Sequence, residues 1–351
     1  MKLLFTAGGS QATVFGIAPL ASAARNAGHE ILLATDDPML ATAEAIGLPA
    51  VSVTHDRVRY ARDGETATTR LDALLSLSRS WHPNVVVGGL SFVPRLLAAC
   101  LAVPFVRHVW HVVPSANLAR KFEQEQQVEM DRLKLTDLPL PALDVDVCPP
   151  SLRSRASTDA QPMRWIPRNR QSRIEPWMHE RSTGRRRVLV TSGTRTPLLD
   201  AGNTTLRHVV VELGKLGAEV VIAAPEAVAA AAGDLGTRVG WIPLDVIAPT
   251  CDVAVHHGGA TTAATLMNAA VPHVVIPDNG FGRAVGEALT AFGSAVMLNP
   301  RVDDLASAIV ASCVRLLGDP AYGASARVLA DEIAVLPTPS QVLTTIESFA
   351  A

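Results

Sequence analysis

Short apolar segments alternate with helix-patterned segments along most of this chain, and this alternation constrains the fold more than any other feature. The first block runs through residues 2–7 (KLLFTA), 17–30 (IAPLASAARNAGHE), 31–35 (ILLAT), 38–47 (PMLATAEAIG) and 48–53 (LPAVSV). It continues through residues 70–83, 84–89, 94–103 and 104–110. Apolar residues at helical spacing in the longer segments, and unbroken apolar runs in the shorter ones, predict helices between strands. Repeated strand–helix–strand units predict a parallel sheet with helices on both faces.

The alternation stops and then restarts, which predicts two domains. A segment rich in Pro, Arg and Ser (PPSLRSRASTDAQPMRWIPRNRQ) begins at residue 149, and the pattern resumes with RVLVTSGTR at residue 187. A chain of 351 residues is long enough for two such units. We expect an N-terminal domain at 1–148, a linker at 149–186 and a second domain at 187–338. Ligands of such sheets bind in the cleft beyond the carboxyl ends of the strands.

Composition excludes several classes of protein. The net charge is −2, and the one compact basic run is GRRR at 184–187, so a nucleic-acid surface with many phosphate contacts is not expected. No uncharged apolar stretch reaches the roughly 18 residues that cross a bilayer, and the apolar run at the N-terminus is too short for a signal peptide. The four cysteines are widely spaced and form no CxxC, which argues against a zinc site or a disulfide framework. We expect a soluble cytoplasmic protein, monomeric or homodimeric, that acts on small molecules.

Two histidines at a glycine turn carry the strongest functional signal. His256 and His257 end the strand DVAV and precede Gly258, Gly259 and a helix that begins near Thr261. A helix N-terminus presents unpaired N–H groups and the positive end of a dipole, which suits phosphate. Glycines let a diphosphate approach the backbone, and a histidine can donate to a phosphate oxygen. The alternative is a strand-end histidine whose polar atoms are satisfied by the backbone.

The segment around this turn, VGWIPLDVIAPTCDVAVHHGGATTAATLMNAAVPHVVIP, resembles the donor motif of the UDP-glycosyltransferase superfamily. That resemblance implies the GT-B fold: two Rossmann-like, doubly wound parallel-sheet α/β domains facing a cleft. The N-terminal domain would bind the acceptor and be completed by a C-terminal helix at 339–351, and the second domain would bind the nucleotide sugar. It also implies that Trp241 and Ile242 contact a nucleobase and that His257 contacts a diphosphate. The remaining donor-binding residues that it implies are Ser192, Gly193, Thr194, Gly259, Thr261 and Thr262.

The first half narrows the resemblance. LLFTAGGSQATVFGIAPLASAARNAGHE and DVCPPSL are similar to actinobacterial deoxysugar transferases that decorate aromatic polyketides, in particular the angucycline C-glycosyltransferase group. The resemblance implies an inverting transferase that moves a deoxyhexose from a TDP-sugar to an angucycline-type aglycone, forming a C-glycosidic bond in antibiotic biosynthesis. Alternatives are an O-glycosyltransferase on a phenol of the same aglycone class and a non-catalytic helper that binds sugar nucleotides. A NAD-dependent dehydrogenase is disfavoured because GGSQATVFG is not GxGxxG.

The catalytic base is where this sequence departs from the superfamily. Most members carry a histidine in the first loop, and Thr13 stands at that position. The C-glycosyltransferases of the group use an aspartate from the strand near residue 110, where this chain has His111. A histidine titrates near neutrality, so His111 is the candidate base, or else a partly buried structural histidine. His108, Ser10 and Thr13 are lesser catalytic candidates. The acceptor-binding candidates are Ser10, Gln11 and Trp110.

Two further departures concern the sugar and the acceptor. The superfamily often grips sugar hydroxyls with an Asp-Gln pair, where this chain has Phe281 and Gly282. A 2,6-dideoxyhexose offers fewer hydroxyls and more apolar surface, which fits that loss. Asp278 and Asn279 either supply one polar contact or form a surface turn. The stretch between His55 and Leu71, which shapes the acceptor pocket in the relatives, is short. We expect neither a metal nor another cofactor, because no acidic cluster indicates a metal site.

Overall fold

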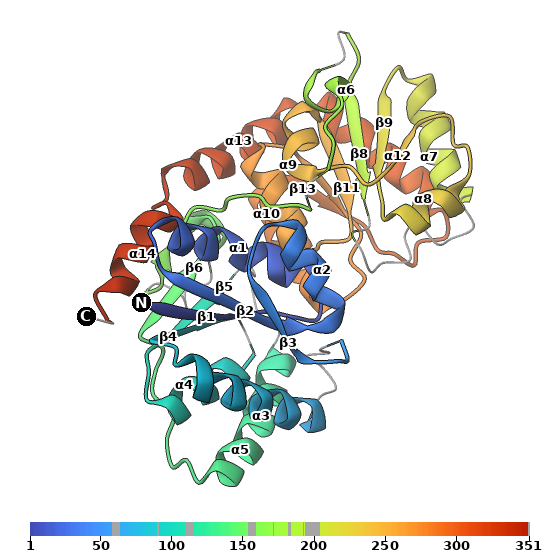
Figure 1. Cartoon of the computed structure of the whole chain (residues 1–351). Coiled ribbons are helices and arrows are strands. Elements are labelled where there is room, and N and C mark those ends of the chain that lie inside the picture. The colour runs from blue at the N-terminus through green and yellow to red at the C-terminus, as the bar shows by residue number, and fades with distance from the viewer. Residues whose placement is uncertain are drawn as a thin grey trace.

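The structure is a computed structural model that describes residues 1–57, 64–89, 91–109, 116–153, 159–170, 172–181, 184–191, 193 and 204–349. It consists of two α/β lobes, each built on its own sheet (Figure 1). No helix in these residues combines the length and the apolar character needed to cross a membrane.

The first lobe contains a seven-stranded sheet in the order β3-β2-β1-β4-β5-β6-β7. Its strands are β1 (Lys2–Thr6), β2 (Glu30–Asp36), β3 (Ala50–Thr54), β4 (Val85–Gly88), β5 (Phe105–Val109), β6 (Leu143–Asp146) and β7 (Gln161–Pro162). All adjacent strands run parallel. In the centre, Leu4 pairs with Leu32 of β2 on one side and with Val86 of β4 on the other. Every residue of β4 is buried, because helices cover both faces of the sheet.

The second lobe contains a six-stranded parallel sheet in the order β10-β9-β8-β11-β12-β13. Its strands are β8 (Arg187–Thr191), β9 (Glu219–Ala223), β10 (Arg238–Gly240), β11 (Val253–His256), β12 (His273–Val275) and β13 (Ala295–Met297). In both sheets the strand order reverses direction beside the first strand, β1 or β8. The predicted pair of doubly wound parallel sheets is therefore confirmed.

The helices lie between the strands in both lobes. In the first lobe they are α1 (Gln11–Asn26), α2 (Asp37–Ala45), α3 (Gly64–Trp81), α4 (Val93–Leu101), α5 (Ala116–Leu133) and η1 (Pro150–Leu152). In the second they are α6 (Pro176–His179), α7 (Thr204–Lys215), α8 (Glu226–Ala232), α9 (Leu244–Ile247), η4 (Ala248–Thr250), α10 (Ala260–Asn268), α11 (Gly280–Phe292), α12 (Leu305–Gly318) and α13 (Pro320–Val335). The last helix is α14 (Pro339–Glu347).

The structure differs from the sequence interpretation between residues 110 and 186. Helix α5 and strand β6 occupy a stretch for which no element was predicted. The segment expected to be a linker contributes β7 to the first sheet, where Gln161 pairs with Val145. Strand β7 has only two residues, which are too few for a hydrophobic pattern, so periodicity does not predict this edge strand. The linker that remains connects the two sheets after residue 162.

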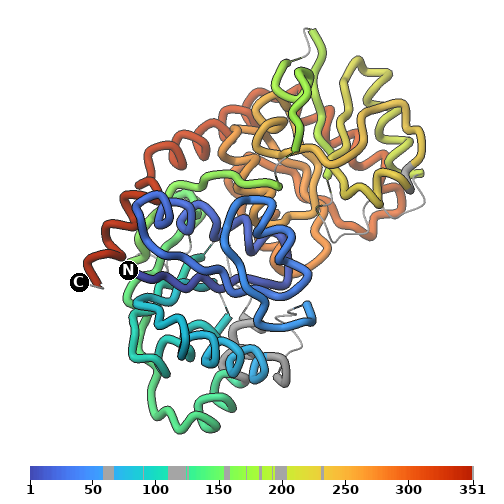
Figure 2. The backbone as a smooth tube through the Cα atoms, in the orientation of Figure 1, coloured from blue at the N-terminus to red at the C-terminus, as the bar shows by residue number. Residues whose placement is uncertain are grey.

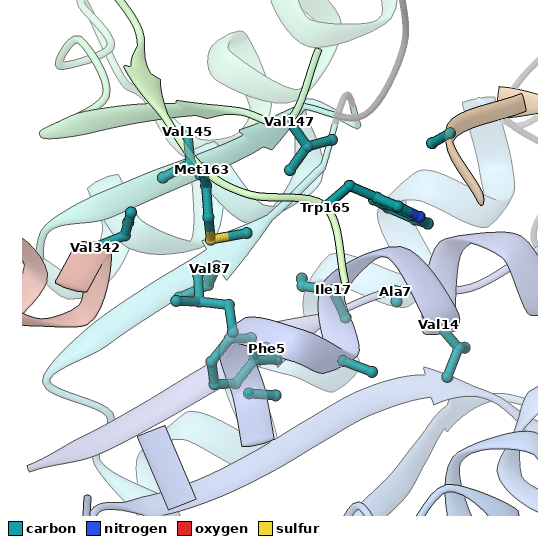
Figure 3. Packing of buried hydrophobic residues seen from close by; sticks show 14 of the residues in the cluster. Phe5, Ala7, Val14, Ile17, Val87, Val145, Val147, Met163, Trp165 and Val342 are labelled. Atoms are coloured by element: carbon teal, nitrogen blue, oxygen red, sulfur yellow. The ribbon is translucent and has the colours of Figure 1, made fainter. Parts of the chain in front are cut away.

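The end of the chain returns to the first lobe. Helix α14 packs on α1, where Val342, Leu343 and Ile346 join the core of the first sheet. Figure 3 shows Val342 in the same cluster as Val87 and Met163. The His29 Nε2 and Glu347 Oε1 atoms are 2.7 Å apart, and the two termini lie close together (Figure 2). The C-terminal helix therefore closes the first lobe and not the second.

The two lobes meet along α1 and α10. Ala263, Ala264 and Met267 of α10 belong to the same buried cluster as the α1 residues Val14 and Ile17. Because α10 follows β11, this contact brings the amino ends of both helices to the junction between the lobes. The predicted cleft is located there.

Candidate functional site

A cavity of about 380 Å³ lies at the junction of the two lobes, at the carboxyl ends of the second sheet's strands. Its walls come from the segments that follow β8, β9, β10, β11 and β12, from the first turn of α1, and from the linker at 168–169. Loops at this edge diverge where the strand order reverses, which leaves room for a ligand. The predicted site is therefore a cavity in the folded protein.

The imidazole of His257 lies between two glycines in this cavity. A Cβ added to Gly193 would be 2.7 Å from His257 Cε1, and one added to Gly259 would be 2.5 Å from His257 Nε2. Both distances are far shorter than van der Waals contact, so neither position admits a side chain without displacing the ring. The glycines therefore fix the ring in a narrow slot at the cavity wall.

Gly258 lets the loop after β11 touch the loop after β12. It has φ +84°, and an added Cβ would be 2.6 Å from Gly282 Cα. Positive φ and this close backbone approach both require glycine. The contact aligns the start of α10, where Gly259 is the N-cap residue and no side chain caps the helix. The first N–H groups of α10, with Thr261 and Thr262 beside them, are thus presented to the cavity.

His257 is a neutral imidazole at physiological pH. Burial lowers its pKa below the ordinary value, and the nearby Asp278 carboxylate opposes that shift without reversing it. Its Nδ1 atom is buried and has no hydrogen-bond partner among the described residues. A neutral ring offers one N–H and one lone pair, so His257 can donate a hydrogen bond to an anionic oxygen in the cavity.

His256, by contrast, faces the interior and pairs with a second histidine. Its Nδ1 accepts a hydrogen bond from the Gly258 N–H at 3.1 Å, and its Nε2 lies 2.9 Å from His273 Nδ1. The Gly258 bond requires an unprotonated Nδ1, so neutral His256 carries its proton on Nε2 and donates it to His273. Both side chains are fully buried. Of the two histidines in the motif, His257 lines the cavity, and His256 stabilises the loop by accepting from the Gly258 N–H.

The buried histidine pair predicts a loss of stability in acid. Burial lowers the pKa of His273 to about 3 and the pKa of His256 well below its ordinary value. The unfolded chain therefore binds more protons than the folded one between about pH 6.5 and pH 3, and stability falls as pH drops through that window. From pH 7.5 to pH 5, His273 alone costs about 2 kcal/mol.

Urea unfolding at pH 7.5 and pH 5 tests this expectation. His273→Gln keeps an acceptor for His256 and removes one titrating group, so its free energy of unfolding should fall by about 2 kcal/mol less than that of the wild type. His179→Gln, at an exposed position, is the matched control and should follow the wild type. Equal losses in the wild type and H273Q would show that the pair does not couple folding to protons.

Trp241 and Ile242 line the cavity after β10. The Ile242 side chain is buried beneath the surface, while the guanidinium of Arg170 stacks 4.5 Å from the centre of the Trp241 ring. Arg170 also pairs with Glu226 Oε1 at 2.7 Å. A cation–π contact of this kind holds the indole in one orientation. Trp241 is thus a fixed aromatic surface in the cavity wall.

Buried polar atoms without a hydrogen-bond partner among the described residues concentrate at the cavity. Eleven such side-chain atoms occur, and five belong to residues that line it: Gln11 Oε1, Arg168 Nε, Asn169 Nδ2, Trp241 Nε1 and His257 Nδ1. Buried polar groups in folded proteins are almost always paired. Three of the five are obligate donors, so the cavity suits a ligand rich in acceptor oxygens.

The first loop contributes two of its three predicted residues. Ser10 and Gln11 line the cavity, and the Ser10 side chain is not used to cap α1. Thr13 does not line it: its hydroxyl donates to Gly8 O at 2.6 Å or Ser10 O at 2.7 Å and accepts from Gly8 N at 3.2 Å. A short hydroxyl in the first helical turn bonds the adjacent backbone. The structure therefore gives the Thr13 hydroxyl backbone partners and places it outside the cavity lining.

His108 is also unsuited to proton transfer in the cavity. Its side chain is fully buried in β5, and burial lowers its pKa to about 4. Four further predicted residues lie outside the described part of the chain: Trp110, His111, Ser192 and Thr194. Gly193, between the last two, is described and meets the cavity as expected.

Several residues that line the cavity were not predicted from the sequence, and for Asp278 and Asn279 the sequence allowed either a polar contact or a surface turn. Arg168 and Asn169 reach the cavity from a segment read only as linker. A short Arg-Asn-Arg run after Trp165 was the available signal, but a linker reading gave it no role. Asp278 and Asn279 both line the cavity and form a turn: Asn279 Oδ1 caps α11 by accepting from Gly282 N at 3.0 Å. Phe281 and Gly282 line the cavity as well.

Comparison with known proteins gives consistent matches along the chain. The family description "Erythromycin biosynthesis protein CIII-like, N-terminal domain" matches residues 58–193, and the corresponding C-terminal domain matches residues 207–349. The L-demethylnoviosyl transferase of Streptomyces niveus is 33% identical over 367 aligned residues, which cover 97% of this chain and 96% of that protein.

Two solved structures share the fold over nearly the whole length of both chains. The Streptomyces sp. SF2575 glycosyltransferase SsfS6, complexed with thymidine diphosphate, has 31% identity and a TM-score of 0.85, covering 99% of each chain. The spinosyn rhamnosyltransferase SpnG, complexed with thymidine diphosphate, has 27% identity and a TM-score of 0.87, covering 99% of this chain and 100% of that one. The GT-B fold implied by the sequence motif is thereby confirmed.

Proposed function

This chain belongs to the erythromycin biosynthesis protein CIII-like family of antibiotic glycosyltransferases, and from that premise we propose that it transfers a deoxyhexose from a TDP-sugar to a phenolic ring of an aromatic polyketide. The chain is a glycosyltransferase of the TDP-sugar-dependent type, with small molecules as substrates. The proposal adds the acceptor class, direct displacement with inversion at the anomeric carbon, and a C-glycosidic bond.

The assignment of a TDP-sugar as the sugar donor rests on one observation: several hydrogen-bond donors face the same cavity. The N-terminus of α10, the His257 imidazole and the buried Arg168, Asn169 and Trp241 nitrogens all face it. A nucleoside diphosphate offers acceptor oxygens on its phosphates and an aromatic base for stacking. Two relatives of this fold hold thymidine diphosphate in solved structures, which supports the same ligand here.

The site stabilises the departure of the nucleotide. Negative charge grows on the leaving diphosphate as the bond to the anomeric carbon breaks. The dipole and free N–H groups at the start of α10, together with the His257 N–H, are fixed before the reaction and need not reorganise. We propose that this set replaces a metal ion as the counter-charge, so transfer proceeds in the presence of a chelator.

The sugar end of the cavity supports a deoxyhexose. Phe281 and Gly282 stand where the superfamily often carries a hydroxyl-gripping Asp-Gln pair, and both line the cavity. Within that loop, Asn279 is occupied by the α11 cap and by a bond to Asp278. An apolar ring and a glycine suit a sugar with methylene and methyl groups in place of hydroxyls. Asp278 remains as a carboxylate that can accept from one sugar hydroxyl.

The acceptor assignment follows from the first half of the chain. Its resemblance to the angucycline group includes the loss of the first-loop histidine, and the Thr13 hydroxyl is tied to Gly8 and Ser10. The base must therefore come from elsewhere, and we propose His111. Removing the phenolic proton gives a phenolate, which attacks through oxygen or through its ortho carbon. Holding that carbon over the anomeric centre is enough to direct the bond to carbon.

A product assay tests the proposed function. We expect the protein, given a TDP-2,6-dideoxyhexose and an angucyclinone, to release TDP and form a glycoside that survives acid hydrolysis. A product cleaved by acid would establish the O-glycosidic bond and correct the site of attack. Tight TDP binding without transfer to any phenolic acceptor would contradict the proposal and favour a helper protein.

A further inference from the structure

The segment that joins the lobes forms part of the cavity wall. It contributes Arg168, whose guanidinium is positively charged at every physiological pH. Among the described lining residues, only Arg168 and Asp278 are charged, because burial keeps His257 neutral. The charges of Arg168 and Asp278 cancel, so the described lining has no net charge, although a diphosphate carries more than one negative charge. Within the described part of the cavity wall, Arg168 is the one cation that can pair with a negative charge of the ligand.

Unlike Arg164 and Arg170, Arg168 has no hydrogen-bond or ion-pair partner among the residues that the structure describes. Arg164 Nε donates to Leu336 O at 3.2 Å, and Arg170 pairs with Glu226 at 2.7 Å. No ion pair or hydrogen bond of Arg168 is found within the described residues, and its Nε atom is buried there. A buried guanidinium N–H is costly unless it is hydrogen-bonded. The position of Arg168 is thus explained by a ligand and not by packing.

Two anchors hold Arg168 in place. On one side, the Trp165 side chain is buried against α10, with its Nε1 donating to Thr265 Oγ1 at 3.4 Å. Figure 3 shows Trp165 in the cluster that contains Val147 and Ile17. On the other side, Arg170 stacks on Trp241 and pairs with Glu226. With three residues to the first anchor and two to the second, Arg168 has little freedom to leave the cavity.

We infer that Arg168 is a binding residue for the nucleotide diphosphate, an inference that rests on the proposed function. A guanidinium presents several N–H groups in a fixed plane and forms paired hydrogen bonds with phosphate oxygens. The Arg168 guanidinium supplies a full positive charge for the diphosphate, whereas the start of α10 and the neutral His257 ring supply only dipoles. Because Arg168 sits in the connection between the lobes, a bound diphosphate also ties that connection to the second lobe.

Binding of thymidine diphosphate, thymidine and inorganic pyrophosphate to matched variants tests the inference. Arg168→Gln should weaken TDP and pyrophosphate binding by roughly 10- to 100-fold, the range for a hydrogen bond to a charged group, and leave thymidine unchanged. R168K should fall between R168Q and the wild type. Arg173→Gln, the same substitution at an exposed linker position, should bind all three as the wild type does.

The outcomes separate this inference from the proposed function. Unchanged TDP affinity in R168Q, or an equal loss of TDP and thymidine affinity, would overturn the role of Arg168. Failure of the wild type to bind TDP at all would instead overturn the donor assignment.

If R168Q does not fold, two other measurements test the role of Arg168: the TDP affinity of R168K and the salt dependence of TDP binding to the wild type. Loss of affinity in R168K and a steep fall with salt support the charge pair. Wild-type affinity in R168K together with salt-independent binding rejects it.

Discussion

Replacing His257 with alanine is expected to reduce transfer by roughly 1,000-fold, because the ring is the fixed donor at the wall where the diphosphate departs. Gly193 and Gly259 flank the imidazole so closely that no other side chain fills the slot after truncation. The loss should fall on the maximal rate more than on TDP affinity, since the N–H matters most as charge develops. Steady-state kinetics with a TDP-deoxysugar, together with direct TDP titration, measure both.

A pair of variants distinguishes hydrogen-bond donation from packing. His257→Asn returns an N–H donor of shorter reach and should recover part of the rate, whereas H257A should not. His179→Ala, on the exposed face of α6, is the control and should transfer sugar at the wild-type rate. Turnover of H257A within a few-fold of the wild type would remove His257 from the mechanism. The leaving diphosphate would then have to be stabilised by the start of α10 and by the Arg168, Asn169 and Trp241 nitrogens.

The lobes were predictable because the strands of a doubly wound sheet are buried on both faces. Segments such as VVVG in β4 and VAVH in β11 carry their apolar character without alternation, and helix-patterned segments separate them. The glycine turn was predictable for a different reason. Its chemistry is local: a strand end, two glycines and a helix start follow one another in sequence, so His257 and the α10 terminus are neighbours before the chain folds.

The rest of the site depends on contacts that only the tertiary structure creates. Arg168 meets the cavity because Trp165 and Arg170 fix the linker against the second lobe, and no periodic pattern encodes a single buried arginine in a Pro-rich segment. Thr13 illustrates that position in a motif does not fix which groups a side chain contacts. Its hydroxyl satisfies the tight Gly8 turn instead. The two adjacent histidines likewise differ: His256 is the last residue of β11 and is buried in the core, whereas His257 lies after the strand and lines the cavity.

His111→Ala is expected to lower the maximal rate of transfer by roughly 100-fold, with little change in TDP affinity. The alternatives among the described residues are weak. His108 is fully buried with a pKa lowered to about 4, and Thr13 is bound to the backbone. Ser10 lines the cavity, but a hydroxyl of ordinary acidity removes no proton from a phenol near neutral pH. In the sequence, His111 stands at the position where the resemblance to the angucycline group implies an aspartate.

The pH dependence of the rate tests the assignment more sharply than the rate alone. A histidine base acts in its neutral form, so the wild-type rate should rise with pH through roughly 6.5 and then level off. In H111A that acid limb should disappear, and the residual rate should follow ionisation of the phenol itself at higher pH.

His111→Asp should restore part of the rate and move the limb to lower pH, because a carboxylate loses its proton earlier. His82→Asn, at an exposed position with φ +51°, should keep the wild-type profile. An H111A variant that retains the acid limb would transfer the role of base to another group, and the phenolate would then have to form without this histidine.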